Sequence, residues 1–166
     1  MGVVARPQPA ARPMTPSRPA RGLAVLLLGE AGAGKTYTAG SLTDPQYCPW
    51  LFWNTDRPDG PDSLKVPAGC EVVDLSERLL TDPTVLLAAL KAELAAPKLR
   101  YKTYCVDSLS FYQNYGIIVP KVAEVGSFHR VGFAGWGDIY IDMMQVLLEL
   151  RALQSRGANV IAAEFA

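Results

Sequence analysis

The sequence predicts an α/β fold, in which a mostly parallel sheet is covered by helices on both faces. Three observations lead to this prediction. Short apolar segments alternate along the chain with segments of helical periodicity. The first apolar segment, residues 23–28, is a continuous hydrophobic run, typical of a strand buried on both faces. The chain has 166 residues, of which 49% are hydrophobic, and this suits one domain with a sizeable core.

The same patterns locate the individual elements. We expect strands at 23–28, 51–54, 70–75, 103–106 and 159–163, and helices at 34–42, 82–95 and 138–155. Asp82 is the expected N-cap of the second helix, with Pro83 at its first helical position. Residues 108–136 are expected to be irregular or partly helical. Because the chain stops directly after its last expected strand, we also expect a domain truncated at its C-terminus, from a longer protein.

Composition separates a tail from the domain and indicates the cellular compartment of the protein. Residues 1–21 are rich in Pro, Arg and Ala and contain no acid, which predicts a disordered tail before a folded domain at 22–166. The net charge is zero, so a nucleic-acid contact would come from a local patch or from the tail. Three cysteines without a C-x-x-C pair favour a reducing, cytoplasmic compartment. No apolar run approaches the roughly 18 residues that span a membrane.

Residues 29–36 read GEAGAGKT, which is the pattern G-x-x-x-x-G-K-T. The glycines permit backbone angles that aim successive amide N–H groups at one phosphate. Lys35 adds a positive charge between the terminal phosphates, and the Thr36 hydroxyl is a ligand for Mg²⁺. A strand before the loop and a helix after it complete the context of a triphosphate site. ATP is the default ligand because the chain has no N-K-x-D element for guanine. The predicted nucleotide-binding residues are Gly29, Glu30, Ala31, Gly32, Ala33, Gly34, Lys35, Thr36 and Tyr37.

Carboxylates at the ends of other strands are the candidate partners of this loop. Asp107 closes the hydrophobic segment YKTYCV and is expected to hold Mg²⁺ together with Thr36. Asp56 follows the second strand; if that strand lies near the first, Asp56 faces the terminal phosphate and activates water. An ordinary acidic turn is the alternative for Asp56, and Glu164 is a third candidate. The predicted catalytic set is therefore Lys35, Asp56 and Asp107.

Four segments together carry a resemblance to a family: GEAGAGKT, LFWNTD, YKTYCVDSLS and WGDIYIDMMQVLLELRALQSRGANVIAAE. The chain resembles the RecA-like, AAA-type P-loop ATPases of bacteriophages and bacteria, among them phage single-strand annealing and recombination ATPases. The resemblance covers residues 22–166. It implies a P-loop NTPase fold, ATP and Mg²⁺ as ligands, ATPase activity and single-stranded DNA as a partner. It also implies a homo-oligomer in a bacterial or phage-infected cell, in which Arg57 or Arg130 is a candidate to complete a neighbour's site.

Six aromatic residues between positions 111 and 136 are interleaved with three basic ones. They are candidates for stacking the bases of single-stranded DNA, or for packing over the sheet edge or against a second subunit. Two other functions stay open at this stage. One is a phosphotransferase of the nucleotide-kinase kind, which would need an arginine-rich lid. The other is a nucleotide-gated DNA-binding module without hydrolysis.

Overall fold

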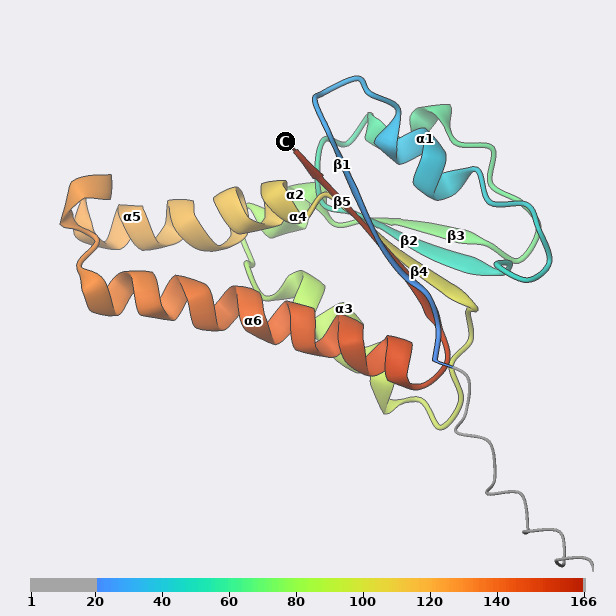
Figure 1. Ribbon diagram of the computed structural model, residues 1–166. Helices are drawn as coiled ribbons and strands as arrows, with labels where there is room; N and C mark the ends of the chain where they lie inside the picture. Colours follow the sequence, from blue (N-terminus) through green and yellow to red (C-terminus); the bar gives the residue numbers. More distant parts are fainter. Residues whose placement is uncertain (1–20, 166) are drawn as a thin grey trace, which may run out of the picture.

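The computed structural model describes residues 21–165, so all but the last residue of the predicted tail at 1–21 lies outside the described part. Its centre is one sheet of five parallel strands in the order β1-β5-β4-β2-β3 (Figure 1). The strands are β1 (Ala24–Gly29), β2 (Trp50–Asn54), β3 (Glu71–Asp74), β4 (Thr103–Asp107) and β5 (Asn159–Phe165). The predicted α/β class and parallel sheet are confirmed.

Helices cover both faces of the sheet, as predicted. Helix α1 (Lys35–Gly40) packs on one face, whereas α3 (Val85–Ala95) and α6 (Phe133–Ser155) pack on the other (Figure 1). The remaining helical segments are η1 (Gly60–Ser63), α2 (Ser76–Leu79), α4 (Leu109–Phe111), the π-helix η2 (Tyr112–Ile118), α5 (Val119–Val125) and η3 (Phe128–Arg130). In the described part of the chain, no helix combines the length and the apolar character needed to cross a bilayer.

The core lies in two layers that differ in size. The larger layer joins β2 and β4 to α3 and α6 through fully buried side chains, including Leu86, Leu90, Val146 and Leu153. The smaller layer, under α1, contains Ala39, Trp50, Phe52 and Cys105. All five residues of β2 and of β4 are buried, because both strands have neighbours on each side and helices on each face.

Two expected helices begin elsewhere, and local contacts explain both differences. The Asp82 side chain accepts hydrogen bonds from the backbone N–H of Thr84 (2.9 Å) and from its hydroxyl (2.7 Å). This closes a turn before α3, so the helix begins at Val85 and Asp82 is not its N-cap. Helix α6 begins at Phe133, five residues before the predicted start at Asp138, despite the weak helix propensity of the glycines in this largely exposed first part, where Trp136 contacts Phe128. The stretch 108–136 is largely helical.

The expectation that the second strand lies near the first is wrong. β5 and β4 separate β1 from β2. All five strands nevertheless run in the same direction, so their carboxyl ends meet at one edge of the sheet. That edge is where open α/β sheets bind ligands.

Candidate functional site

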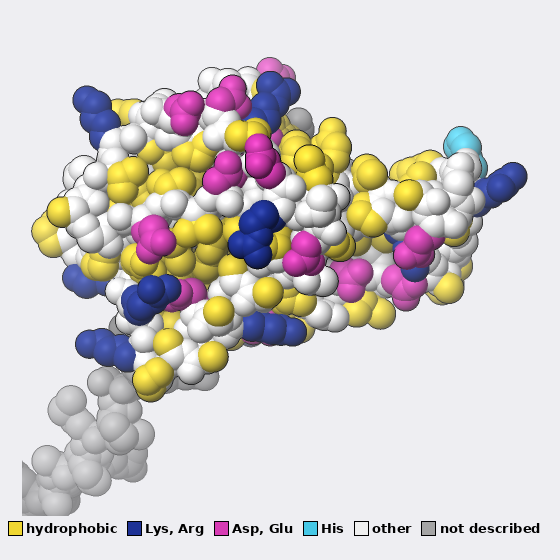
Figure 2. Space-filling view, turned by 180° about the vertical axis from the view of Figure 1, so that it is seen from behind, with side chains coloured by type: hydrophobic (Ala, Val, Ile, Leu, Met, Phe, Trp, Pro, Cys, Tyr) yellow, Lys and Arg dark blue, Asp and Glu magenta, His cyan; other side chains and the backbone are white. Residues whose placement is uncertain are grey.

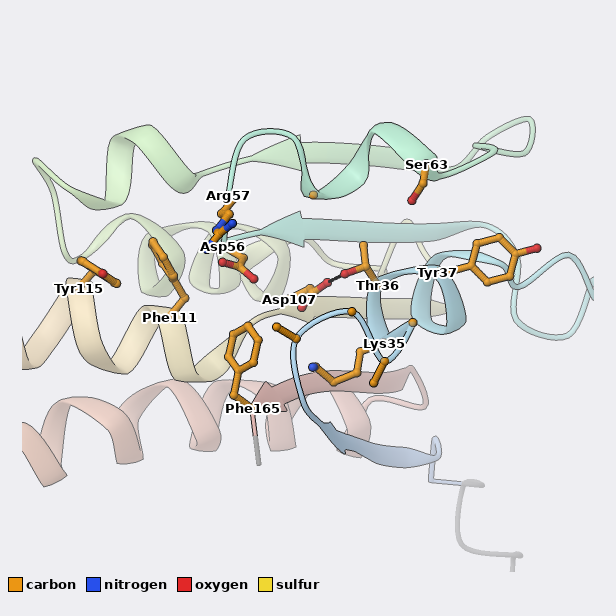
Figure 3. A pocket seen from close by; sticks show the side chains of 15 residues that line it. Lys35, Thr36, Tyr37, Asp56, Arg57, Ser63, Asp107, Phe111, Tyr115 and Phe165 are labelled. Atoms are coloured by element: carbon orange, nitrogen blue, oxygen red, sulfur yellow. Dashed lines mark hydrogen bonds between the residues drawn. The ribbon is translucent and has the colours of Figure 1, made fainter.

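A cavity of about 510 Å³ opens at the carboxyl edge of the sheet (Figure 3). It lies between the glycine-rich loop that follows β1 and the ends of β2, β4 and β5. The cavity brings together the four predicted residues that carry chemistry: Lys35, Thr36, Asp56 and Asp107. Its other lining residues are Ala31, Gly32, Ala33, Gly34, Tyr37, Arg57, Gly60, Ser63, Phe111, Tyr115 and Phe165.

Glycine conformations shape the loop. Gly32 and Gly34 adopt φ angles of 79° and 82°, in the left-handed region that side chains rarely tolerate. The backbone N–H of Ala33 donates to the carbonyl of Glu30 at 3.2 Å, so the loop curls back on itself before α1 begins at Lys35. This curl of residues 29–36 surrounds the predicted phosphate site, into which the backbone amides of the loop are predicted to point.

Lys35 lies inside the curl. Its Nζ donates to the carbonyl oxygens of Gly29 (2.7 Å) and Glu30 (2.9 Å). The same ammonium group lies 4.4 Å from the centre of the Phe165 ring, a cation–π contact. The lysine is thus held at the cavity by its own loop and by the tip of β5.

The Thr36 hydroxyl donates to Oδ2 of Asp107, which joins the start of α1 to the end of β4 across 71 residues of sequence (Figure 3). Asp107 is only 3% exposed. Burial raises the pKa of its carboxyl, while the hydrogen bond from Thr36 and the charge of Lys35 oppose that change. Two oxygen donors therefore converge at the mouth of the loop.

Backbone contacts between the ends of β2 and β4 position Asp56. The N–H of Thr55 donates to the carbonyl of Asp107 at 2.6 Å, and its hydroxyl donates to the carbonyl of Ser108 at 2.8 Å. The side-chain oxygen of Asn54 accepts from the N–H of Asp56 at 3.3 Å. The pKa of Asp56 is raised, first by burial and then by repulsion from Asp107. Asp56 is therefore next to the site even though β2 is not next to β1.

Several cavity residues were not predicted as binding residues. Phe165 lines the cavity, whereas the predicted candidate Glu164 is not among the lining residues. Neighbouring side chains of a strand point to opposite faces, and an apolar residue at a strand end carries no polar signal in the sequence. Arg57, a candidate to complete a neighbour's site, lines the cavity of its own chain. Arg130 lies in η3, at the far end of the helical arm formed by α5 and α6 (Figure 1).

The aromatic stretch does not form one surface. Phe111 and Tyr115 line the cavity and stack with ring centres 4.2 Å apart. Tyr112 is 3% exposed and belongs to the core. Phe128 and Trp136 contact each other at the end of the arm, with ring centres 5.1 Å apart. Only the first two of these aromatic residues are therefore part of the candidate site.

The oxygen donors at the cavity suit a hard divalent cation. Mg²⁺ is typically held by one or two protein oxygens, with phosphate oxygens and water completing its shell. The Thr36 hydroxyl and the Asp107 carboxylate are donors of this kind, and they already touch. Within residues 21–165 no cluster of three or more His, Cys, Asp or Glu side chains is arranged to hold a metal ion.

No protein-family model matches the chain, and no curated protein is significantly similar to it. The function is therefore inferred from the geometry of the cavity and from the chemistry of its side chains.

Proposed function

We propose that this chain is a P-loop ATPase that binds ATP with Mg²⁺ and couples its hydrolysis to single-stranded DNA. The observation that carries the proposal is the contact between Thr36 and Asp107 at the mouth of the glycine-rich loop. A loop of the form G-x-x-x-x-G-K-T cradles phosphates, and a carboxylate at the end of another strand completes the metal site in such proteins. Both parts line one cavity here.

The triphosphate is expected to bind in the curl of the loop. Backbone amides of residues 32–36 are expected to donate to its oxygens, and the positive φ angles of Gly32 and Gly34, which glycine adopts without strain, let the loop curl around the phosphates. Lys35 exchanges its bonds with the carbonyls of Gly29 and Glu30 for bonds with the terminal phosphates. A hydrogen bond from the ammonium group to a charged phosphate oxygen is stronger than one to a neutral carbonyl oxygen.

Thr36 and Asp107 would hold Mg²⁺ beside the terminal phosphates. The cation, when bound, neutralises the charge that develops on the phosphoryl oxygens. The contact between the two side chains keeps their oxygens on the same side of the cavity. The positive charge of a metal also favours the ionised form of Asp107, which burial alone disfavours.

Asp56 is the candidate general base for the attacking water. It lies beside Asp107, on the side of the cavity away from Tyr37 (Figure 3). Its raised pKa makes it a better proton acceptor than an ordinary exposed aspartate. Arg57 lines the cavity beside Asp56, and its positive charge would stabilise the negative charge on the phosphoryl group.

The test compares three cavity variants with matched exposed variants. Lys35→Ala is expected to abolish ATP binding measured by calorimetry, whereas Lys65→Ala is not. Asp107→Ala should retain part of the binding and lose Mg²⁺-dependent turnover. Asp56→Asn should bind ATP normally and lower turnover by about 10²–10⁴-fold, whereas Asp62→Asn should not.

Turnover is measured with and without single-stranded DNA, and we expect the DNA to accelerate it. Unchanged ATP affinity in Lys35→Ala would refute the assignment of the site. Phosphate transfer to nucleoside monophosphates would instead identify a nucleotide-kinase-like enzyme. Tight binding of ATP without turnover would identify a nucleotide-gated DNA-binding module.

A further inference from the structure

The cavity has aromatic side chains at both of its ends. In Figure 3, Tyr37 lies on one side of the contact between Thr36 and Asp107, and the pair Phe111–Tyr115 lies on the other side, beyond Asp56. A nucleoside triphosphate on the glycine-rich loop has one base. One of the two aromatic ends is therefore left without a base of that nucleotide to hold, and Tyr37 is the end that directly follows Lys35 and Thr36 in the sequence.

Backbone contacts and close packing position the Phe111–Tyr115 pair. The Ser108 hydroxyl caps α4 by accepting from the N–H of Phe111 at 3.1 Å. Helix α4 continues directly into the π-helix η2, which carries Tyr115. A Cβ at Gly116 would lie 2.9 Å from Cδ1 of Leu79, so this segment packs closely against the side chains of α2.

The pair is also accessible from the cavity. Tyr115 is 44% exposed, and its ring lies nearly parallel to that of Phe111, with 27° between the planes. A stack of this kind leaves the outer face of the tyrosine free for another planar ring. Arg57 lines the same end of the cavity and offers a cation for a phosphate group. Flat rings beside a cation are the chemistry that holds single-stranded nucleic acid.

We propose that Phe111 and Tyr115 form a second subsite, which stacks a nucleobase beside the terminal phosphate of the bound nucleotide. The subsite rests on the proposed function, because the triphosphate is what occupies the rest of the cavity. A base stacked here lies next to Asp56 and the reacting phosphate. Binding of a strand would thereby order the groups on which turnover depends.

The base has two possible sources, an unpaired strand of DNA or a free mononucleotide, and stacking serves both. The cavity favours the strand. A phosphate acceptor in a nucleotide kinase needs several arginines around it, whereas Arg57 is the sole arginine among the residues that line this cavity. The open position of Tyr115 also leaves room for a chain to enter and leave.

The experiment measures binding of a fluorescent 20-residue oligothymidylate, with the β,γ-imido analogue of ATP and Mg²⁺ present. Tyr115→Ala should weaken that binding about tenfold or more, because one stacked base is lost. Tyr115→Phe should bind normally. Tyr140→Ala is the matched control, because this tyrosine is 65% exposed on α6 and outside the cavity. Thymidine monophosphate is titrated in parallel, and its binding tests whether the stacked base comes from a free mononucleotide.

A strand carrying 5-iodouracil adds a direct readout, since irradiation should cross-link it to Tyr115 or Phe111. Loss of monophosphate binding in Tyr115→Ala, with the oligonucleotide unaffected, would support the base subsite and assign it to a free nucleotide. The subsite is overturned if Tyr115→Ala binds both ligands as the parent chain does, if the parent chain binds neither, or if the cross-link falls elsewhere. ATP affinity is measured on the same samples. A parent chain that does not bind ATP would refute the proposed function itself.

Discussion

Asp107 experiences two opposing influences at the tip of β4. Burial disfavours its charged form, whereas the Thr36 hydroxyl and the Lys35 ammonium favour it. Burial dominates, so the pKa of the folded protein lies above the ordinary value of 3.8. The folded protein therefore binds a proton at this carboxyl more readily than the unfolded chain does. As a result, the contribution of Asp107 to the free energy of unfolding falls as the pH rises through the folded pKa.

Replacing Asp107 by the neutral Asn should consequently stabilise the protein at neutral pH in the absence of ligand. The gain should shrink as the pH falls towards 3.8, because the carboxyl then takes up a proton in the folded state first and below 3.8 is protonated in both states. Urea denaturation between pH 4 and pH 8 measures this dependence. Asp62→Asn, at an exposed position, should show no such trend. A constant difference at every pH would contradict the expectation.

At the scale of elements, α6 is the longest helix and contributes one side to the main core. One side of its last three turns is buried against the sheet and α3, with Leu150 at 4% exposed and Leu153 at 0%. The opposite side carries exposed apolar residues, including Leu148 at 56%. The two sides of one helix should therefore respond differently to the same truncation.

Leu153→Ala is expected to lower the free energy of unfolding by about 2–5 kcal/mol, because it removes buried methyl groups and leaves a cavity. Leu148→Ala should change it by no more than about 0.5 kcal/mol. Chemical denaturation of both variants at one pH gives the comparison. Equal losses would show that the outer side of α6 is buried in solution.

At the scale of the whole molecule, β1 and β3 are the two edge strands of the sheet, and β1 is the one beside α6. Within residues 21–165 its outer edge has no neighbouring strand, and its side chains alternate in exposure. Leu26 is 51% exposed and lines an apolar groove of about 370 Å³ between β1 and α6. Figure 2 shows the molecule from behind, where acidic and basic side chains are interspersed with apolar ones. An exposed apolar edge is a template for pairing with other chains.

Leu26→Lys should reduce self-association, because a charge at an edge strand opposes pairing with a second copy. Light scattering at increasing protein concentration measures the effect. Leu148→Lys places the same charge on an exposed part of α6 and controls for net charge. Scattering that falls equally in both variants would assign the effect to charge alone.

Much of the architecture could be predicted because it depends on neighbouring residues. The run at 23–28 forms β1 with a shift of one residue at each end, and the segment 103–106 becomes β4 with Asp107 as its last residue. Helix ends were harder, since a side-chain bond such as the one between Asp82 and Thr84 moves a boundary without changing the apolar pattern. Phe165 could not be predicted as a cavity residue, because its role depends on where Lys35 points.

By itself, the sequence determined the alternation of strands and helices and the glycine-rich loop with Lys35 and Thr36, because periodicity and contiguous motifs act within a few residues. Only the tertiary structure decided the strand order, which places Asp56 beside Asp107 rather than beside the loop strand. It also divided the aromatic residues between the cavity, the core and the helical arm. Such choices depend on packing between distant segments, since a side chain's neighbours are set by the fold and not by its position in the chain.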